Sequence, residues 1–301
     1  MSGGDPPTPV QRRLIGAAAE IATDPEGIAL AFIHTVLCQT CLPYRDPGRD
    51  VREWMRTNGG ISLMVQAGAA QRPDRGLVKV GLPFGPKPRL ILGYLNAQAL
   101  RQQNPVVDVG GSLTRFVRRL GLDTGGRTQN PVRDQLERLS AARVVLGMNT
   151  ATINTNIVDA FDLWSGEDGQ RLLWPSIVRL SDAYFRSLMD HAIPLDERAL
   201  GALSHTAMGL DVYAWLAQRL HRVAPGQDVL IAWPLLHDQF GSGYGRLRAF
   251  RAAFCVAVRQ VLAVYRDARL EIDERGLVLR HSKPPVARRM VEVAALPSRN
   301  G

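Results

Sequence analysis

Residues 111–148, GSLTRFVRRLGLDTGGRTQNPVRDQLERLSAARVVLGM, decide the fold of this chain. Gly111 and Ser112 can cap a helix over SLTRFVRRLGL, whose apolar residues share one face: Leu113, Phe116, Val117 and Leu120. The glycine-bearing turn DTGGRTQN leads to a second helix, PVRDQLERLSAA, with an apolar side made of Val132, Leu136 and Leu139. The segments ARVVLGM and TINTNIVDAFDLW then alternate like paired strands. This order of helix, turn, helix and hairpin predicts a winged helix-turn-helix.

The same order recurs in the second half of the chain. There RLLWPSIVRL is typical of a strand, and SDAYFRSLMDH, LDERALGAL and MGLDVYAWLAQRLHRV are typical of helices. The strand QDVLIAW precedes a short helix, PLLHDQFG, the turn GSGYG, the amphipathic helix RLRAFRAAFCVAVRQVLAVY and the hairpin ARLEIDERGLVLRHS. Chance repetition is the alternative, because a helix-turn-helix followed by strands is common in α+β proteins. We expect an α+β fold with two tandem winged helix-turn-helix domains.

These patterns divide the chain into four regions. Residues 1–25 form an N-terminal helical extension, in which amphipathic spacing relates Val10, Ile15, Ala18 and Ile21. Residues 26–165 form a first winged-helix-like domain and residues 170–286 a second, DNA-binding one, with the boundary in GEDGQ. Residues 287–301 form a flexible basic tail. Within the first domain, residues 61–68 and 76–84 are expected to be strands, and a helix is expected from Pro88 to Gln103.

Positive charge is concentrated in two stretches. The chain has 37 Lys and Arg against 28 Asp and Glu, a net charge of +9. Residues 241–290 hold 11 basic and 4 acidic residues and residues 113–143 hold 7 and 3, so the remainder is slightly acidic. Lysine occurs only at positions 79, 87 and 283. The arginines that make up the rest suit bidentate contacts with phosphate and guanine, although genomic codon bias is another source of such an excess.

The second helix of each unit carries the candidate DNA-reading residues, because this helix enters the major groove and its N-terminal residues contact base edges. In the first unit they are Arg127, Thr128, Gln129, Asn130 and Arg133. In the second they are Tyr244, Arg246, Arg248 and Arg251, followed by Arg259, which is placed for phosphate contact. The hairpin residues expected at the DNA backbone or minor groove are Arg275, Arg280, His281 and Lys283. The alternative for each arginine is a solvated position on a helix face.

Common catalytic and cofactor-binding motifs are absent from the sequence. It has no G-x-x-x-x-G-K-[ST], H-E-x-x-H or G-x-S-x-G, and its six histidines lack a paired-ligand spacing. We expect no enzyme activity, cofactor or metal, although a site assembled from distant residues stays open. The C-x-x-C of Cys38 and Cys41, with His34 upstream, lies in an apolar stretch and favours core packing over zinc or redox chemistry. No apolar run approaches the ~20 residues of a membrane helix and the start lacks a secretory signal, so a cytoplasmic protein is expected.

Seven stretches between about Leu42 and Val286 resemble plasmid replication initiators of the RepA type. In chain order they are LPYRDPG, RTNGGISLMVQAG, GLPFGPKPRLILGYLNAQALR, GGSLTRFVRRLGL, LWPSIVRLSDAYFRSLMDHAIPLDERALGAL, GLDVYAWLAQRLHR and LIAWPLLHDQFGSGY. The most specific are G-x-P-x-G-x-x-P-R-L, from Gly81 to Leu90, and the pair GLDVYAWLAQRL and WPLLHDQFG.

The resemblance implies a protein that binds repeated sites, or iterons, in double-stranded plasmid origin DNA. It also implies that the protein helps to open the duplex and recruits the host replication initiator and the replicative helicase. The alternatives are a winged-helix transcriptional repressor without a replication role and a structural protein whose arginines face an acidic partner. The segments GPKPRLILGYLNAQALR and 28–42 lie apart from the reading helices, so they are candidates for a homodimer or helicase-docking surface.

Overall fold

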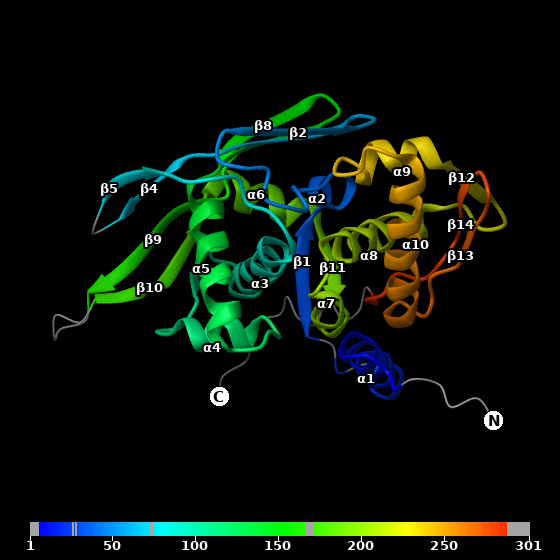
Figure 1. Ribbon diagram of the computed structural model, residues 1–301, viewed down its shortest axis with the longest axis horizontal. Coiled ribbons are helices and arrows are strands. Elements are labelled where there is room, and N and C mark those ends of the chain that lie inside the picture. Colours follow the sequence, from blue (N-terminus) through cyan, green and yellow to red (C-terminus); the bar gives the residue numbers. More distant parts are fainter. Residues whose placement is uncertain (1–5, 26, 28, 73–74, 166–170, 288–301) are drawn as a thin grey trace.

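The computed structural model describes residues 6–25, 27, 29–72, 75–165 and 171–287, and it confirms the α+β class. Two units of helices and strands lie on either side of a central antiparallel strand pair (Figure 1). This pair joins β1 (Leu30–His34) to β11 (Ala192–Asp196). One continuous cluster of buried apolar side chains runs through both units, which therefore fold around a shared core.

The first unit combines three helices with a three-stranded antiparallel sheet. Its elements are α3 (Pro86–Gln102), β6 (Val106–Asp108), α4 (Leu113–Arg119), α5 (Gly126–Ala141), β9 (Val158–Ser165) and β10 (Arg171–Leu180). The strand order is β6-β10-β9, so the last strand lies in the middle. The Ser112 side chain caps α4 by accepting a hydrogen bond from the Arg115 amide at 3.2 Å, which agrees with the sequence pattern.

The second unit repeats this order of elements. It consists of α8 (Ala207–Arg219), the short 3-10 helix η1 (Leu220–Arg222), β12 (Asp228–Ala232), α9 (Trp233–Phe240), α10 (Leu247–Val264), β13 (Leu270–Ile272) and β14 (Gly276–Arg280). Its strand order is β12-β14-β13, again with the last strand in the middle. Both units therefore have the sequence helix, strand, helix, helix, hairpin and the same sheet topology.

A four-stranded antiparallel sheet is inserted into the first unit. Its order is β2-β3-β7-β8, formed by β2 (Glu53–Asn58), β3 (Ile61–Gln66), β7 (Arg143–Met148) and β8 (Ala151–Asn156). The strands β7 and β8 directly follow α5, where the sequence predicts the hairpin of the winged helix. They pair with β3 and not with β6, because Leu63, Val65, Val144 and Leu146 form one buried apolar face. The hairpin that joins β6 is β9–β10, and a separate hairpin pairs β4 (Ala69–Arg72) with β5 (Gly76–Lys79).

The predicted boundary at residues 165–170 falls within the β9–β10 hairpin. The two strands pair from Val158 opposite Leu180 to Ser165 opposite Arg171, while residues 166–170 themselves lie outside the described residues. The chain passes between the units after β10, through α6 (Asp182–His191), β11 and α7 (Glu197–Leu203). The predicted basic tail lies outside the described residues from position 288 onward.

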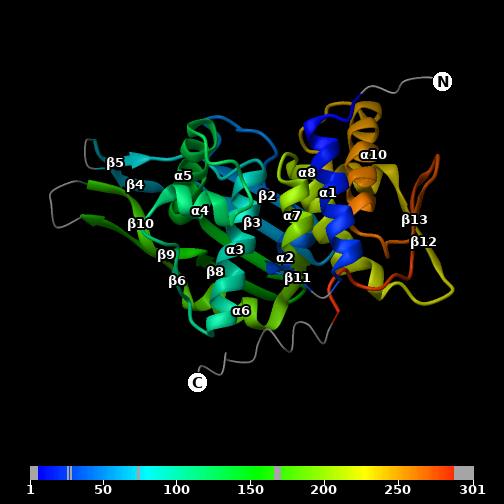
Figure 2. The same cartoon turned by 90° about the horizontal axis from the view of Figure 1, so that it is seen from below.

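The N-terminal extension is a single helix, α1 (Pro9–Thr23), that packs against the second unit beside α7 and α10 (Figure 2). Thr8 and Gln11 form a reciprocal capping box at its start. Leu14 is buried, and the partly buried residues beside it include Val10, Ala17 and Ile21. Ile15 was expected on this face, but it is 62% exposed because the buried stripe passes through position 14.

The segments considered as a dimer or helicase-docking surface are buried. All five residues of β1 are buried, and α2 (Thr35–Gln39) places Val36, Leu37 and Cys38 in the core. Helix α3 is buried continuously from Pro88 to Ala97, because it packs on β1, α5 and α8. These segments hold the two units together and do not form an exposed surface. Among the described residues, no helix is both long and apolar enough to cross a membrane.

Candidate nucleic-acid interface

The start of α5 presents polar side chains to solvent. Arg127, Asn130 and Arg133 are exposed on the side opposite the buried Val132 and Leu136. The first turn, GRTQ, has no acidic residue, so the arginines and the positive end of the helix dipole reinforce each other. This surface suits phosphates and base edges.

Thr128 and Gln129 are half-buried at the turn between α4 and α5. The side-chain Nε2 of Gln129 donates hydrogen bonds to the Thr124 carbonyl at 2.6 Å and to Thr114 Oγ1 at 3.2 Å. These bonds fasten α5 to α4, so Gln129 orients the helix. Its proposed contact with a base stays a prediction and would require these bonds to open.

The start of α10 also presents arginines. Arg246 and Arg248 are exposed, and so is Arg259 farther along the helix. Arg251 is half-buried, with its guanidinium 4.9 Å from the centre of the Trp233 ring. Arg246, Arg248 and Arg259 can therefore reach another molecule directly, whereas Arg251 also helps to hold α10 against α9.

Tyr244 orders the turn before α10. Its ring packs edge-on against Phe250 at 5.9 Å, and its carbonyl accepts a hydrogen bond from His237 Nε2 at 2.9 Å. These contacts give Tyr244 a structural role in the turn. Its role in reading DNA stays a prediction.

The hairpin residues differ in exposure and ion pairing. Arg275 is 74% exposed at the β13–β14 turn, with Asp273 3.4 Å away. Arg280 lies between two carboxylates of neighbouring strands, Asp228 at 3.1 Å and Glu271 at 3.0 Å. His281 and Lys283 are exposed beyond the end of β14. Arg275 is the more accessible of the two arginines, because Arg280 is engaged within the sheet.

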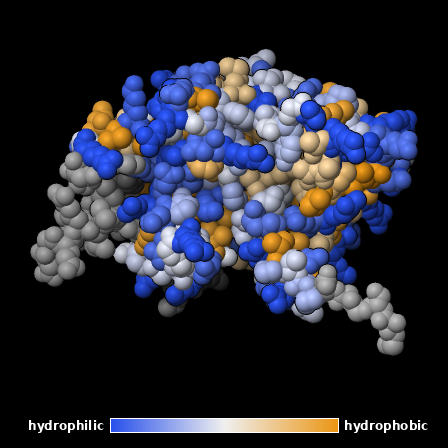
Figure 3. Space-filling model, in the orientation of Figure 1, coloured by the Kyte–Doolittle hydropathy of each residue, from blue (hydrophilic) through white to orange (hydrophobic). Residues whose placement is uncertain are grey.

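The candidate reading helices share one face of the molecule. In Figure 1, α5 and α10 lie on the side turned toward the viewer, on opposite sides of the β1–β11 pair, and Figure 2 shows both near the upper edge. Hydrophilic surface covers α5, while an apolar area lies over α10 (Figure 3). One bound molecule could therefore contact both helices.

Helix α4 adds arginines that the sequence reasoning did not single out. Arg115 and Arg118 are exposed. Arg119 is exposed too, and its guanidinium donates to Tyr94 Oη at 3.0 Å. The charge concentration over residues 113–143 already contained this signal, and the helix that precedes a reading helix commonly crosses the DNA backbone.

A buried ion pair joins the two units beneath this face. Arg89 of α3 binds Asp211 of α8 through Nε–Oδ1 and Nη2–Oδ2 contacts of 2.6 and 2.7 Å. The guanidinium also donates to the carbonyls of Gly85 at 2.6 Å and Leu42 at 2.9 Å. Burial raises the pKa of Asp211, and the positive charge of Arg89 opposes that rise. The pair fixes α3 against α8, and through them the positions of the two units.

The sequence motifs singled out above meet at this junction. Arg89 belongs to the stretch Gly81–Leu90, and Asp211 belongs to GLDVYAWLAQRL. In the third motif, WPLLHDQFG, the Gln239 side chain donates to the Gln39 carbonyl at 2.9 Å, and the Cys41 thiol lies 3.4 Å from the Gln239 carbonyl. These motifs therefore contribute to the architecture more than to the exposed reading surface.

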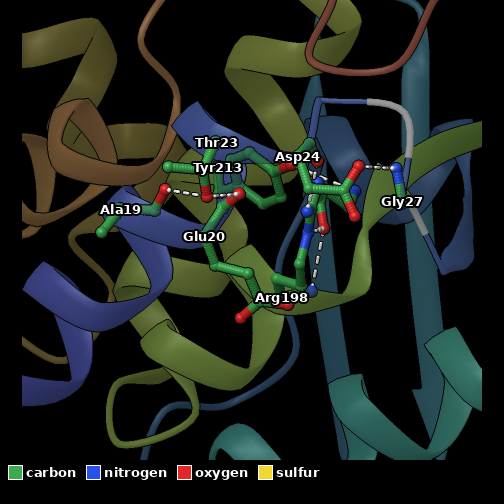
Figure 4. A network of polar contacts seen from close by, with 8 residues as sticks. Ala19, Glu20, Thr23, Asp24, Gly27, Arg198 and Tyr213 are labelled. Carbon is green, nitrogen blue, oxygen red and sulfur yellow. Dashed lines mark hydrogen bonds and ion pairs between the residues drawn. The ribbon is translucent and has the colours of Figure 1, made fainter.

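Arg198 ties the N-terminal helix to the same central region (Figure 4). Its guanidinium pairs with Asp196 of β11 at 2.7 Å and donates to the Asp24 carbonyl, at the end of α1, at 2.7 Å. The Asp196 amide donates to Tyr213 Oη at 3.1 Å. One network thus links α1, β11 and α8.

Both ring nitrogens of His34 are engaged within the protein. Nδ1 accepts the Val36 amide at 3.2 Å, so Nε2 carries the proton that faces Ser187 Oγ at 2.9 Å. Burial, aided by His191, lowers the pKa of His34 to about 3. Burial raises the pKa of Cys41 to about 11, so its thiol is protonated at neutral pH. These contacts support the packing interpretation of the Cys38, Cys41 and His34 group.

The arrangement places the chain in a class of mixed α+β folds with solved examples. A crystal structure of SeMet derivatives of domains 2 and 3 of RctB is similar with a TM-score of 0.54 and 13% identity, covering 84% of this chain and 97% of that chain. A second crystal structure, of RctB domains 2-3, has a TM-score of 0.46 and 11% identity over 81% and 94% of the two chains. No curated protein sequence matches.

Residues 82–235 match the family model of the plasmid-encoded RepA protein, RepA_C. The match covers half of the chain. It begins between β5 and α3, ends within α9, and includes Arg89, the whole of α5 and Asp211. This chain belongs to the RepA family of plasmid replication proteins. The family expected from the sequence is confirmed.

Proposed function

We propose that this chain is a plasmid replication initiator that binds repeated origin sequences in double-stranded DNA. In this proposal the two units are tandem winged helix-turn-helix domains, which grip successive major grooves. The observation that carries it is the repeated plan. In each unit the third strand lies between the first two, and the last helix, α5 or α10, presents exposed arginines at its start. Family membership supports the plasmid context.

Opening of the origin would draw on binding energy and DNA deformation, without a nucleotide cofactor. The host replication initiator and the replicative helicase are the partners proposed for the opened DNA. The protein is proposed to act in the cytoplasm, without catalytic chemistry of its own. A homodimer stays a proposal, but its surface would have to lie outside α3 and β1, because both are buried.

Salt dependence of duplex binding tests the DNA-binding step. If roughly 6–10 phosphates are contacted, affinity is expected to fall by ~10³–10⁵ between 50 and 200 mM salt. Changing Arg127, Arg133, Arg246 and Arg248 to Gln one at a time is expected to weaken binding, and each lost phosphate contact lowers the salt slope by about 0.9. Arg186→Gln on α6, outside both units, is the matched control. A flat salt response, or full affinity in all four variants, would contradict the proposal.

A winged-helix repressor without a replication role is the second candidate. An obligate dimer on one palindrome would present two identical reading helices, whereas α5 and α10 of one chain differ in sequence. That difference favours repeated, non-palindromic sites. Deletion of the gene separates the candidates: loss of the plasmid supports initiation, and derepression of a promoter without plasmid loss supports the repressor.

A further inference from the structure

The solvent face of α10 contains an exposed valine between arginines. The buried face of this helix consists of Phe250, Phe254, Ala257, Val258, Val261 and Val264. On the opposite side, Arg248, Ala252, Val256 and Arg259 are exposed and follow one another at helical spacing. The Val256 residue is 51% exposed.

Packing within the protein does not account for this valine. Helix α10 contacts α1, α7, α8 and α9, and these elements leave Val256 half-exposed. Valine is also a weaker helix former than alanine, so its exposed position brings no gain in local stability. Figure 3 shows an apolar area over α10, and the exposed apolar residues of this helix include Leu247 and Val256. A contact with another molecule would bury this side chain, which gains free energy from leaving water.

The charges around Val256 select duplex DNA as that molecule. Arg248 and Arg259 are separated by three helical turns, roughly 16 Å along the axis. The major groove is about 12 Å wide, so arginines at this separation can reach its walls while the residues between them face the bases. The small side chain of Ala252 permits a close approach. Apolar side chains in this position contact the C5-methyl group of thymine.

We infer that Ala252 and Val256 contact the methyl groups of thymines in the part of the DNA site that α10 reads. This inference rests on the proposed function and specifies the base chemistry of the site. Helix α5 differs, because its exposed Arg127, Asn130 and Arg133 are suited to hydrogen bonds with guanine and adenine. One chain therefore reads two chemically different half-sites.

Replacement of thymine by deoxyuridine tests the inference, since it removes the methyl group and leaves base pairing intact. The probe is a duplex selected from a random library by binding to the full chain, with each thymine replaced singly. Binding is measured by fluorescence anisotropy at constant salt. We expect a group of neighbouring thymine positions at which replacement by deoxyuridine lowers the affinity of the unmutated protein about fourfold for each contacted methyl group.

The variant Val256→Ala links the loss to the side chain. It is expected to bind the thymine duplex more weakly and to lose the penalty for deoxyuridine at one of those positions. Val51→Ala, at an exposed valine just before β2, is the matched control and should keep the full penalty. Equal affinity for every substituted duplex, or an unchanged penalty in Val256→Ala, overturns the thymine contact even if salt-dependent duplex binding is retained. Loss of that binding altogether would instead reject the proposed function.

Discussion

Asp211→Asn tests the buried ion pair that joins the two units. The substitution preserves the shape of the side chain but leaves the Arg89 guanidinium, which is 7% exposed, without a neutralising carboxylate. It also removes an acceptor from one of two hydrogen bonds, whose lengths are 2.6 and 2.7 Å. Removing one partner of a buried pair costs about 3–5 kcal/mol. We expect the free energy of unfolding to fall by that amount.

Urea unfolding of the full chain, followed by circular dichroism, measures this free energy. The matched control is Asp228→Asn, because Asp228 pairs with Arg280 at 3.1 Å on the surface, where such pairs are worth about 0–1 kcal/mol. The double variant Arg89→Met, Asp211→Leu removes both charges and is expected to recover most of the loss. If Asp211→Asn costs no more than the surface control, the reasoning about the junction is refuted.

Three further tests apply the same unfolding measurement to separate elements. His34 is neutral in the folded protein and takes up a proton on unfolding, so the free energy of unfolding of the unmutated chain should fall by about 2 kcal/mol from pH 7 to pH 5. The His34→Gln variant should lose this part of the pH dependence, and an unchanged pH dependence would contradict the assignment. Leu14→Ala should cost about 2–5 kcal/mol and Ile15→Ala very little; equal costs would argue against the packing of α1. Gln129→Ala should cost about 1 kcal/mol for each hydrogen bond removed, and no change would show that α4 and α5 are held otherwise.

Local sequence patterns predicted the helices that carry the candidate interface. Most periodic apolar residues of α4, α5 and α10 are buried, with Leu247 at the start of α10 as an exception, and Ser112 caps α4 as expected. These features depend on neighbours within about a turn of helix, so the sequence displays them directly. Which arginines remain exposed also follows from the helical period, as Arg127 and Arg248 illustrate.

Long-range pairing could not be predicted in the same way. The strands β7 and β9 both follow α5 and both contain apolar residues. Only pairing with distant strands distinguishes them: β7 pairs with β3 of the inserted sheet, whereas the β9–β10 hairpin joins β6 through β10. The roles of Arg89 and Gln129 were hidden for a similar reason. Their hydrogen-bond partners depend on tertiary or turn geometry, which residue spacing does not reveal.

The first and the last described segments pack on different parts of the molecule. Helix α1 packs on the second unit, while Val286 packs with Leu30 and Phe32 of β1, in the central strand pair. During synthesis, the contacts of α1 with α10 and of Val286 with β1 can form only after residues 247–286 have left the ribosome. A gene fusion that exchanges one half with that of a relative would also mismatch these crossed contacts. Under the proposed function, new DNA specificity is therefore expected to evolve through side chains on α5 and α10 more readily than through exchange of halves.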